Sequence, residues 1–282
     1  MKIFLPVWGD QYIDWAKRGL LKSLCWKKNA AALRGAEFLI ATDKPEAFTE
    51  PTLFPQETTQ SFIPPHKTEL MRKEFADYAL PIAIEKCLAV KEPMLLATAD
   101  YVFADGSIDS LKEFGTYPGV CVSAAHVRVH PNILTTLPDN CTSQQLVDLA
   151  WYDGHLHSSW ANSNCKKGRN NSYAGGVSWR ALGSLIFVQH RLPTAFMVNF
   201  ITSDLDYFKR EPFNSWDWNW PETWTERMRY LGSSDAAFIV EITLPTLNNP
   251  AIRDTNQEEP DWFHIHKSHM GINRQFVSVF RR

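Results

Sequence analysis

The chain has 282 residues, with 29 lysines and arginines against 31 aspartates and glutamates, and 44% of its residues are hydrophobic. This length is ample for a sizeable core. The charged fraction of 21% and the formal net charge of -2 exclude an intrinsically disordered chain and a strongly basic nucleic-acid binder. Tryptophan is unusually frequent, with 11 residues. Because a buried indole N–H needs a hydrogen-bond partner, this surplus indicates faces that bind flat ligands or a tryptophan-rich core.

The cysteines argue for a reducing compartment. There are five of them, scattered along the chain and never spaced as Cys-x-x-Cys. This pattern disfavours both a disulfide framework and a structural zinc site. The N-terminal apolar stretch is too short for a secretory signal, and no apolar run approaches the ~18 residues that a membrane span needs. We therefore expect a soluble, cytoplasmic protein with no membrane span.

The first part of the chain alternates between strand and helix patterns. Lys2–Trp8 and Glu37–Asp43 read as buried strands, and the segment between them shows helical spacing of its apolar residues. Strand, helix and strand at these lengths predict parallel pairing with a right-handed crossover. Thr68–Val90 is the next predicted helix, which Pro81 is expected to kink or split. Met94–Ala97 is then predicted to be a central strand.

The second part of the chain has a different pattern. Gly119–His130 alternates like a strand, whereas residues 151–183 are rich in Asn, Ser and Gly and read as loops. The apolar runs Ser184–His190 and Pro193–Ile201 are strands or short helices, between which periodicity does not decide. Gly232–Ile242 is predicted to begin as a helix. No linker separates the two parts, and we expect them to share one continuous sheet.

Three side chains follow directly on predicted strands. Trp8, Asp43 and Asp100 each lie just past the carboxyl end of such a strand. Ligands of open α/β sheets bind outside the carboxyl ends of the strands. We therefore expect the three residues to gather along one edge of the sheet.

The order of these parts is the strongest functional signal. Phe4–Leu24 and Phe38–Asp43 resemble the first two strands of the nucleotide-sugar glycosyltransferases of the GT-A fold. Met94–Ile108 resembles the strand and acidic turn that carry the Asp-x-Asp metal-binding motif of that family. The resemblance implies an α/β fold with a Rossmann-like central mixed sheet flanked by helices. It further implies a single domain over the whole chain, with residues 1–110 binding the nucleotide sugar and residues 111–282 binding the acceptor.

The same resemblance implies where the donor binds. A nucleotide-sugar donor, expected to be a UDP-sugar, would be contacted by Pro6, Trp8, Asp43, Lys67 and Asp100. The ring of Trp8 would cover the base, and Asp43 would accept hydrogen bonds from the base or ribose. The structural alternatives are a core position for Trp8, a turn for Asp43 and a solvated charge for Lys67.

A divalent cation, Mn²⁺ or Mg²⁺, would neutralise the diphosphate leaving group as the glycosidic bond breaks. Thr98 stands in place of the first acid of the motif, so Asp100 would be the carboxylate ligand. His264 and His266 share a face if their segment is extended, and they are further candidate ligands of the metal. Alternatively, Asp100 and Asp105 cap a turn before a helix, and the histidines belong to a solvated loop.

Catalysis and acceptor binding are expected in the second half. Asp235 resembles the acid at the head of the acceptor-site helix in many GT-A enzymes. It is the candidate catalytic base that takes the proton of the acceptor hydroxyl. Its alternative role is to complement a helix dipole. Trp216, Trp218 and Trp220 would lie on one side of an extended segment and form a platform for an acceptor sugar. Packing under a loop and a partner interface are the alternatives for these tryptophans.

The predicted function is therefore transfer of a sugar from a nucleotide-sugar donor to a saccharide or other hydroxyl acceptor. One alternative is a glycosyltransferase acting on a hydroxymethylated DNA base, against which the near-neutral charge counts. Another is a non-catalytic carbohydrate-binding protein that uses its tryptophans. A nucleotidyltransferase is a third alternative, but the glycine-rich phosphate loop expected after its first strand is missing here.

Overall fold

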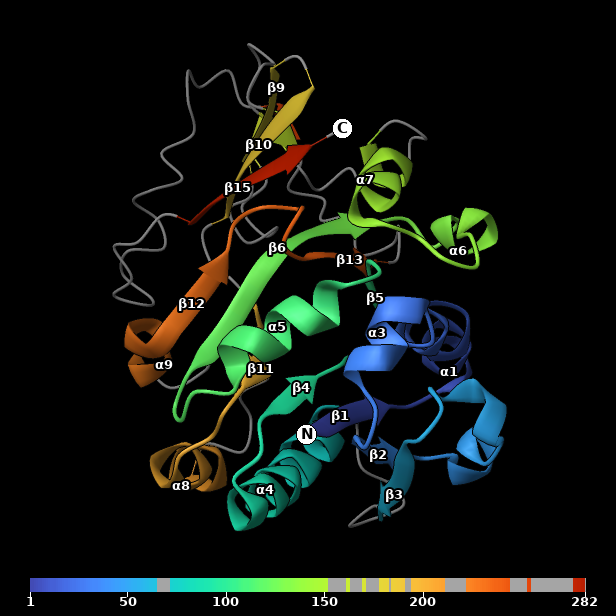
Figure 1. Cartoon of the computed structure of the whole chain (residues 1–282), viewed down its shortest axis with the longest axis vertical. Coiled ribbons are helices and arrows are strands. Elements are labelled where there is room, and N and C mark those ends of the chain that lie inside the picture. The colour runs from blue at the N-terminus through green and yellow to red at the C-terminus, as the bar shows by residue number, and fades with distance from the viewer. Residues whose placement is uncertain are drawn as a thin grey trace.

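The structure is a computed structural model that describes residues 1–64, 72–151, 161–162, 169–170, 178–182, 184–190, 194–210, 222–243, 253–254 and 276–281. These residues form a mixed α/β fold around a nine-stranded sheet, with smaller sheets of four and two strands (Figure 1). The predicted α/β class with a central mixed sheet flanked by helices is confirmed at this level. None of the described helices is both long and apolar enough to cross a membrane.

The large sheet takes its strands from both halves of the chain: β1 (Lys2–Val7), β2 (Glu37–Thr42), β3 (Thr59–Ile63), β4 (Met94–Leu96), β5 (Tyr101–Phe103), β6 (Cys121–Val129), β11 (Ala195–Val198), β12 (Met228–Leu231) and β13 (Phe238–Ile242). Their order is β3-β2-β1-β4-β11-β6-β13-β5, and β12 also pairs with β6. This arrangement confirms that strands of both halves share one sheet.

Strand direction in this sheet creates one chemically distinct edge. β1, β2, β3 and β4 run parallel to one another. β11 runs antiparallel to both β4 and β6, so β6 again runs in the direction of β4, and β13 is parallel to β6. The carboxyl ends of β1, β2, β4, β6 and β13 therefore lie at the same edge, which we call the carboxyl edge.

The predicted parallel unit at the start of the chain is confirmed. β1 pairs with β2 in register from Lys2 opposite Glu37 to Val7 opposite Thr42. Both strands are buried except at their first residue, as expected for parallel strands covered on both faces.

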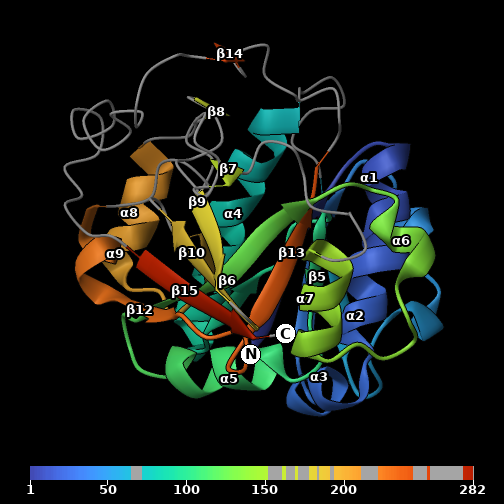
Figure 2. The same cartoon turned by 90° about the horizontal axis from the view of Figure 1, so that it is seen from above.

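Helices cover both faces of the large sheet (Figure 2). Helices α4 and α8 pack over one core cluster, α1 to α3 with α5 over a second, and α6 with α7 over a third. The helical segments are α1 (Asp10–Trp15), the π-helical η1 (Ala16–Leu21), α2 (Lys22–Leu24), α3 (Lys27–Ala32), η2 (Pro45–Phe48), η3 (Pro51–Leu53), α4 (Arg72–Val90), α5 (Ser107–Gly115), α6 (Ile133–Thr136), α7 (Ser143–Trp151), α8 (Thr202–Arg210) and α9 (Glu222–Arg227).

The two ambiguous apolar runs are both strands: β10 lies in the four-stranded sheet and β11 in the large sheet. The four-stranded sheet has the order β15-β10-β9-β7, and the two-stranded sheet pairs β14 with β8. The ring of Phe280 lies 5.0 Å from that of Phe238 and 5.1 Å from that of Trp151, centroid to centroid, so aromatic contacts attach β15 to β13 and α7. The bounds are β7 (Ala161–Asn162), β8 (Arg169–Asn170), β9 (Ser178–Leu182), β10 (Leu185–His190), β14 (Arg253–Asp254) and β15 (Phe276–Arg281).

Two local predictions do not hold as made, although of the two outcomes expected at Pro81 only the split is wrong and a kink stays a prediction. Pro81 does not split its helix, because α4 continues through it from Arg72 to Val90, with Leu80 and Ala83 beside the proline buried in the core. Gly232–Ile242 is not a helix either: a turn leads into strand β13. The end of that segment consists of aromatic and β-branched residues around one glutamate, a composition that favours a buried strand.

The side chains of Asp105 and Asn29 cap the N-termini of two helices reciprocally. Asp105 Oδ1 accepts hydrogen bonds from the backbone N–H groups of Lys28 (2.8 Å) and Asn29 (3.1 Å) at the start of α3. In return, Asn29 Oδ1 accepts from the N–H groups of Gly106 (3.0 Å) and Ile108 (3.2 Å) at the start of α5. The Asn29 amide also donates to backbone carbonyls at the end of β5. Asp105 therefore caps a helix, but this helix is α3 and not α5, which follows its own turn.

Replacing Asn29 by alanine should destabilise the fold by about 2–4 kcal/mol, because several buried backbone groups lose their partners at once. Chemical denaturation measures this loss. The matched control is Asn140→Ala, since exposed Asn140 accepts, among the described residues, one hydrogen bond, from Lys27 N–H at 3.3 Å. Equal losses in the two variants would contradict the role assigned to Asn29.

Candidate functional site

The carboxyl edge carries the side chains that follow the first strands of the sheet. Trp8 comes directly after β1 and Asp43 directly after β2. Gly9 N–H lies 3.2 Å and 3.3 Å from the two carboxylate oxygens of Asp43, and Gly9 has a positive φ of 73°, which glycine adopts without strain. Asp43 is exposed. The structure thus brings Trp8 and Asp43 together, as the strand order predicted.

Trp8 is partly buried and packs against the core cluster under α4. Its indole nitrogen is buried and has no hydrogen-bond partner among the residues that the structure describes. The core position considered for Trp8 is therefore confirmed for part of this side chain, and its contact with a nucleotide base stays a prediction.

Pro6 is buried inside β1, and it marks the point at which the β1–β4 ladder stops. The pairing ends at Phe4, whose carbonyl accepts a hydrogen bond from Ala97 N–H at 3.0 Å. Alternate residues of a strand turn their backbone groups to the same neighbour, so Pro6 is the next residue on this side, and it has no N–H to donate. The chain after β4 leaves β1 here and reaches β13, where the carbonyl of Asp100 accepts from Ile242 N–H at 2.8 Å.

Asp100 is thereby brought beside residues from β6 and β13. Glu241 is paired with Arg128 in the β13–β6 register, and Arg128 Nε lies 3.0 Å and 3.1 Å from its two carboxylate oxygens. His126 lies two residues before Arg128 and so projects from the same face of β6. We call Asp100, Glu241, Arg128 and His126 the acid–arginine cluster.

The Asp100 carboxyl has an unusual pKa. Burial, and next the negative charge of Glu241, raise its pKa to about 7, against the opposing effects of the nearby Thr98 side chain and of the Arg128 charge. At neutral pH this carboxyl is therefore close to the midpoint of its titration. Positive charge supplied by a ligand at this position would favour its ionised form.

The pKa of His126 is shifted in the other direction. Burial, together with the charge of Arg128, lowers its pKa to about 4, although Glu241 acts to raise it. Its ring also makes an edge contact with the ring of Phe196, at 5.6 Å between centroids. The imidazole is accordingly neutral at physiological pH, so the cluster has Arg128 as its fixed positive charge.

The residues around Asp100 fit one mode of divalent-cation binding. Carboxylate and hydroxyl oxygens, as on Asp100 and Thr98, suit Mg²⁺ or Mn²⁺, but Glu241 is already bound to Arg128. Among the described residues no group of three His, Cys, Asp or Glu side chains is arranged to hold a metal ion. A cation here would therefore be held through one protein carboxylate together with phosphate oxygens and water, which is how Mg²⁺ commonly binds with nucleotide substrates.

Asp235 does not lie with these residues. It is in the turn before β13, where its exposed carboxylate pairs with Arg281 at 3.3 Å. β13 itself spans about 13 Å from Phe238 to Ile242, so Asp235 is at the opposite edge of the sheet from Asp100. The segment that was predicted to direct Asp235 into the site as a helix instead leads into strand β13. The acid that β13 brings to Asp100 is Glu241.

The other candidates lie outside the residues that the structure describes. These are Lys67 for the donor diphosphate, His264 and His266 for the metal, and the acceptor platform of Trp216, Trp218 and Trp220.

The sequence contained a signal for the residues that were missed. Glu241 is the one charged residue in the apolar run Phe238–Ile242, and His126 and Arg128 alternate with apolar residues in Cys121–Val129. Charged side chains are seldom placed inside buried strands unless they are paired. Such an interruption therefore indicates a polar site, although it does not reveal the partner.

Asp100→Asn should change the pH dependence of stability. Between the ordinary pKa of 3.8 and about 7, folded Asp100 keeps a proton that the unfolded chain releases. Its contribution to stability is thus present below about pH 4 and is lost as the pH rises through 7. Asparagine does not ionise. The free energy of unfolding of the variant minus that of the parent should therefore be larger at pH 8 than at pH 4. Urea denaturation in the presence of EDTA measures this difference, and a constant difference across the range would contradict it.

His126→Gln should change the acid side of the same profile. The pKa of His126 falls from 6.5 to about 4 on folding, so its contribution is present above pH 6.5 and is lost as the pH falls towards 4. The variant should therefore lose less stability than the parent between pH 7 and pH 4.5 in thermal unfolding. Asp100 makes the protein more stable as the pH falls over this interval, which opposes the effect of His126. The slope of stability against pH is therefore compared between the variant and the parent. A variant slope equal to the parental slope would refute the assignment.

Comparison with known proteins finds no protein-family model and no curated protein that matches this chain. The functional assignment therefore depends on the carboxyl edge itself. That edge combines an exposed carboxylate at Asp43, a partly buried indole at Trp8 and a carboxyl of raised pKa at Asp100, next to the guanidinium of Arg128.

Proposed function

We propose that this protein is a glycosyltransferase that moves a sugar from a nucleotide-sugar donor, expected to be a UDP-sugar, to a hydroxyl of a saccharide acceptor. The observation that supports the proposal is that Trp8, Asp43 and Asp100 each follow the carboxyl end of one of the parallel strands β1, β2 and β4. Ligands of open α/β sheets bind at this edge. The resemblance of the same segments to GT-A glycosyltransferases supports a nucleotide sugar as the ligand.

The nucleoside would bind over β1 and β2. The Trp8 ring offers a flat apolar surface for a base, and the exposed Asp43 carboxylate accepts hydrogen bonds from a base N–H or a ribose hydroxyl. Asp43 is held in place by Gly9 N–H. The position of the Asp43 carboxylate is therefore set by the backbone after β1, close to the Trp8 ring that would cover the base.

The diphosphate would bind at Asp100. A divalent cation at Asp100 would neutralise the charge that develops on the leaving diphosphate. The positive charge of Arg128 acts on Asp100 and would act on a diphosphate bound there. Glu241 holds the Arg128 side chain by accepting from its Nε–H with both carboxylate oxygens. Arg128 and Glu241 thus prepare a site for an anionic leaving group.

A thermal-shift panel of nucleoside diphosphates with MnCl₂ tests the ligand class. UDP should raise the melting temperature, since a ligand at 100 times its Kd stabilises the native state by about 2.7 kcal/mol. Asp100→Asn should weaken UDP binding in MnCl₂ by about tenfold or more, and release of UDP from a UDP-sugar should fall with it. The absence of stabilisation by every nucleoside diphosphate would refute the proposed function.

The matched control is Asp14→Asn. Asp14 is an exposed aspartate on α1 that pairs only with Arg18 four residues along the helix, among the described residues. This variant should bind UDP as the parent does. Full UDP release by Asp100→Asn would remove Asp100 from the diphosphate site, even if UDP still bound.

A further inference from the structure

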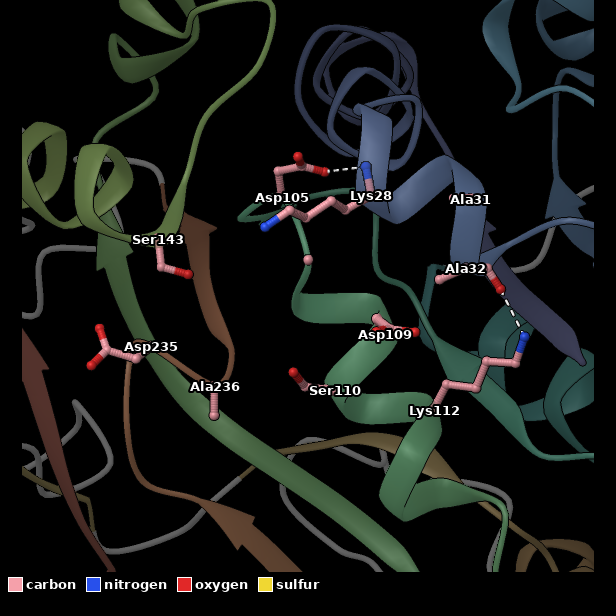
Figure 3. A pocket seen from close by; sticks show the side chains of 11 residues that line it. Lys28, Ala31, Ala32, Asp105, Asp109, Ser110, Lys112, Ser143, Asp235 and Ala236 are labelled. Carbon is pink, nitrogen blue, oxygen red and sulfur yellow. Dashed lines mark hydrogen bonds between the residues drawn. The ribbon is translucent and has the colours of Figure 1, made fainter.

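A hollow lies at the opposite edge of the sheet from Asp100. It has a volume of about 560 Å³, within the range of pockets that hold small molecules. Its walls are α3 and α5 on one side, and the start of α7 with the turn before β13 on the other (Figure 3). We call it the α3–α5 groove, defined by its polar lining residues Lys28, Asp109, Ser110, Lys112, Ser143 and Asp235.

Only part of this lining is available to a ligand. The Lys112 ammonium donates to the carbonyl of Ala32 at 2.9 Å, and Asp235 pairs with Arg281. In Figure 3 the ammonium of Lys28 and the hydroxyls of Ser110 and Ser143 extend into the space between the walls, whereas the Asp235 carboxylate points away from it. Within the described residues, these three groups form no hydrogen bond with one another or with other side chains.

The groove is poorly suited to an anion. Its charged residues are two lysines and three aspartates, Asp105 included. The helix amides that could have bound an anion are already occupied: Asn29 Oδ1 caps the start of α5, and Thr142 and Gln145 cap the start of α7 reciprocally. An anion would have neither a positive surplus nor free helix N–H groups.

The groove is equally unsuited to a cation. The ammonium of Lys28 extends into it, and a second positive charge there would be repelled. No group of three metal-ligating side chains is found among the described residues. What the groove does offer is hydroxyls that donate and accept, an ammonium that donates and the exposed carboxylate of Asp109 that accepts.

We propose that the α3–α5 groove binds a neutral polyhydroxylated ligand, a saccharide or polyol, at a site separate from the carboxyl edge. Ligand hydroxyls both donate and accept, so they match the acceptor at Asp109, the donor at Lys28 and the serine hydroxyls. The site does not depend on the proposed transferase activity. In a glycosyltransferase it would hold a remote part of a glycan, and in a protein without that activity it would bind saccharide alone.

The test uses the full chain with ¹³C-labelled alanine methyl groups, observed by NMR. Ala31 and Ala236 line the groove, whereas Ala97 and Ala99 lie next to Asp100 at the carboxyl edge. Glucose, maltose and sorbitol are titrated separately, with inorganic phosphate and 1,4-diaminobutane as charged comparisons. A saccharide or sorbitol should shift the methyl signals of Ala31 and Ala236 and leave those of Ala97 and Ala99 in place.

Two exposed neighbouring lysines give a matched pair of variants. Lys28→Met should weaken saccharide binding by about tenfold through loss of a charged donor, whereas Lys27→Met, which is outside the groove, should change it less than twofold. The proposal is overturned if none of the neutral ligands shifts Ala31 or Ala236. It is also overturned if phosphate or the diamine shifts them instead, or if both lysine variants bind equally. UDP binding at the carboxyl edge is measured on the same samples, so failure at one site is distinguished from failure at the other.

Discussion

A backbone hydrogen bond from Ile242 N–H to the carbonyl of Asp100 extends the β5–β13 ladder to the place where the candidate site forms. It exists because the chain after β4 leaves the β1 ladder at the level of Pro6 and crosses towards β13. The crossing places Asp100 beside Glu241 and Arg128, and burial there raises the pKa of Asp100. The electrostatics of the site thus depend on where one strand ladder ends.

Strand order was the part of this site that the sequence could predict. Trp8 and Asp43 follow apolar runs long enough to be recognised as strands, and parallel strands bring their carboxyl ends to one edge whatever happens elsewhere. Each of these inferences needed only the pattern around the residue itself.

The remainder of the site depends on register between distant strands. Glu241 meets Arg128 because β13 pairs with β6 in one register, and a slip of a single residue would turn Glu241 to the other face. Nothing in the neighbourhood of either residue specifies that register. The misplaced Asp235 has a related cause, since an acid followed by apolar residues fits both the first turn of a helix and the approach to a strand. Tertiary pairing decided between them.

The exchange of caps between Asn29 and Asp105 also has a consequence for how the molecule opens. α3 has only six residues and would not be stable in isolation. Its cap comes from Asp105 after β5, and the cap of α5 comes from Asn29 within α3 itself. Neither helix start is complete without the other, so α3, the end of β5 and the first turn of α5 form one cooperative unit. Fluctuations that expose one of them to solvent expose all three, and a ligand held between α3 and α5 would close them together.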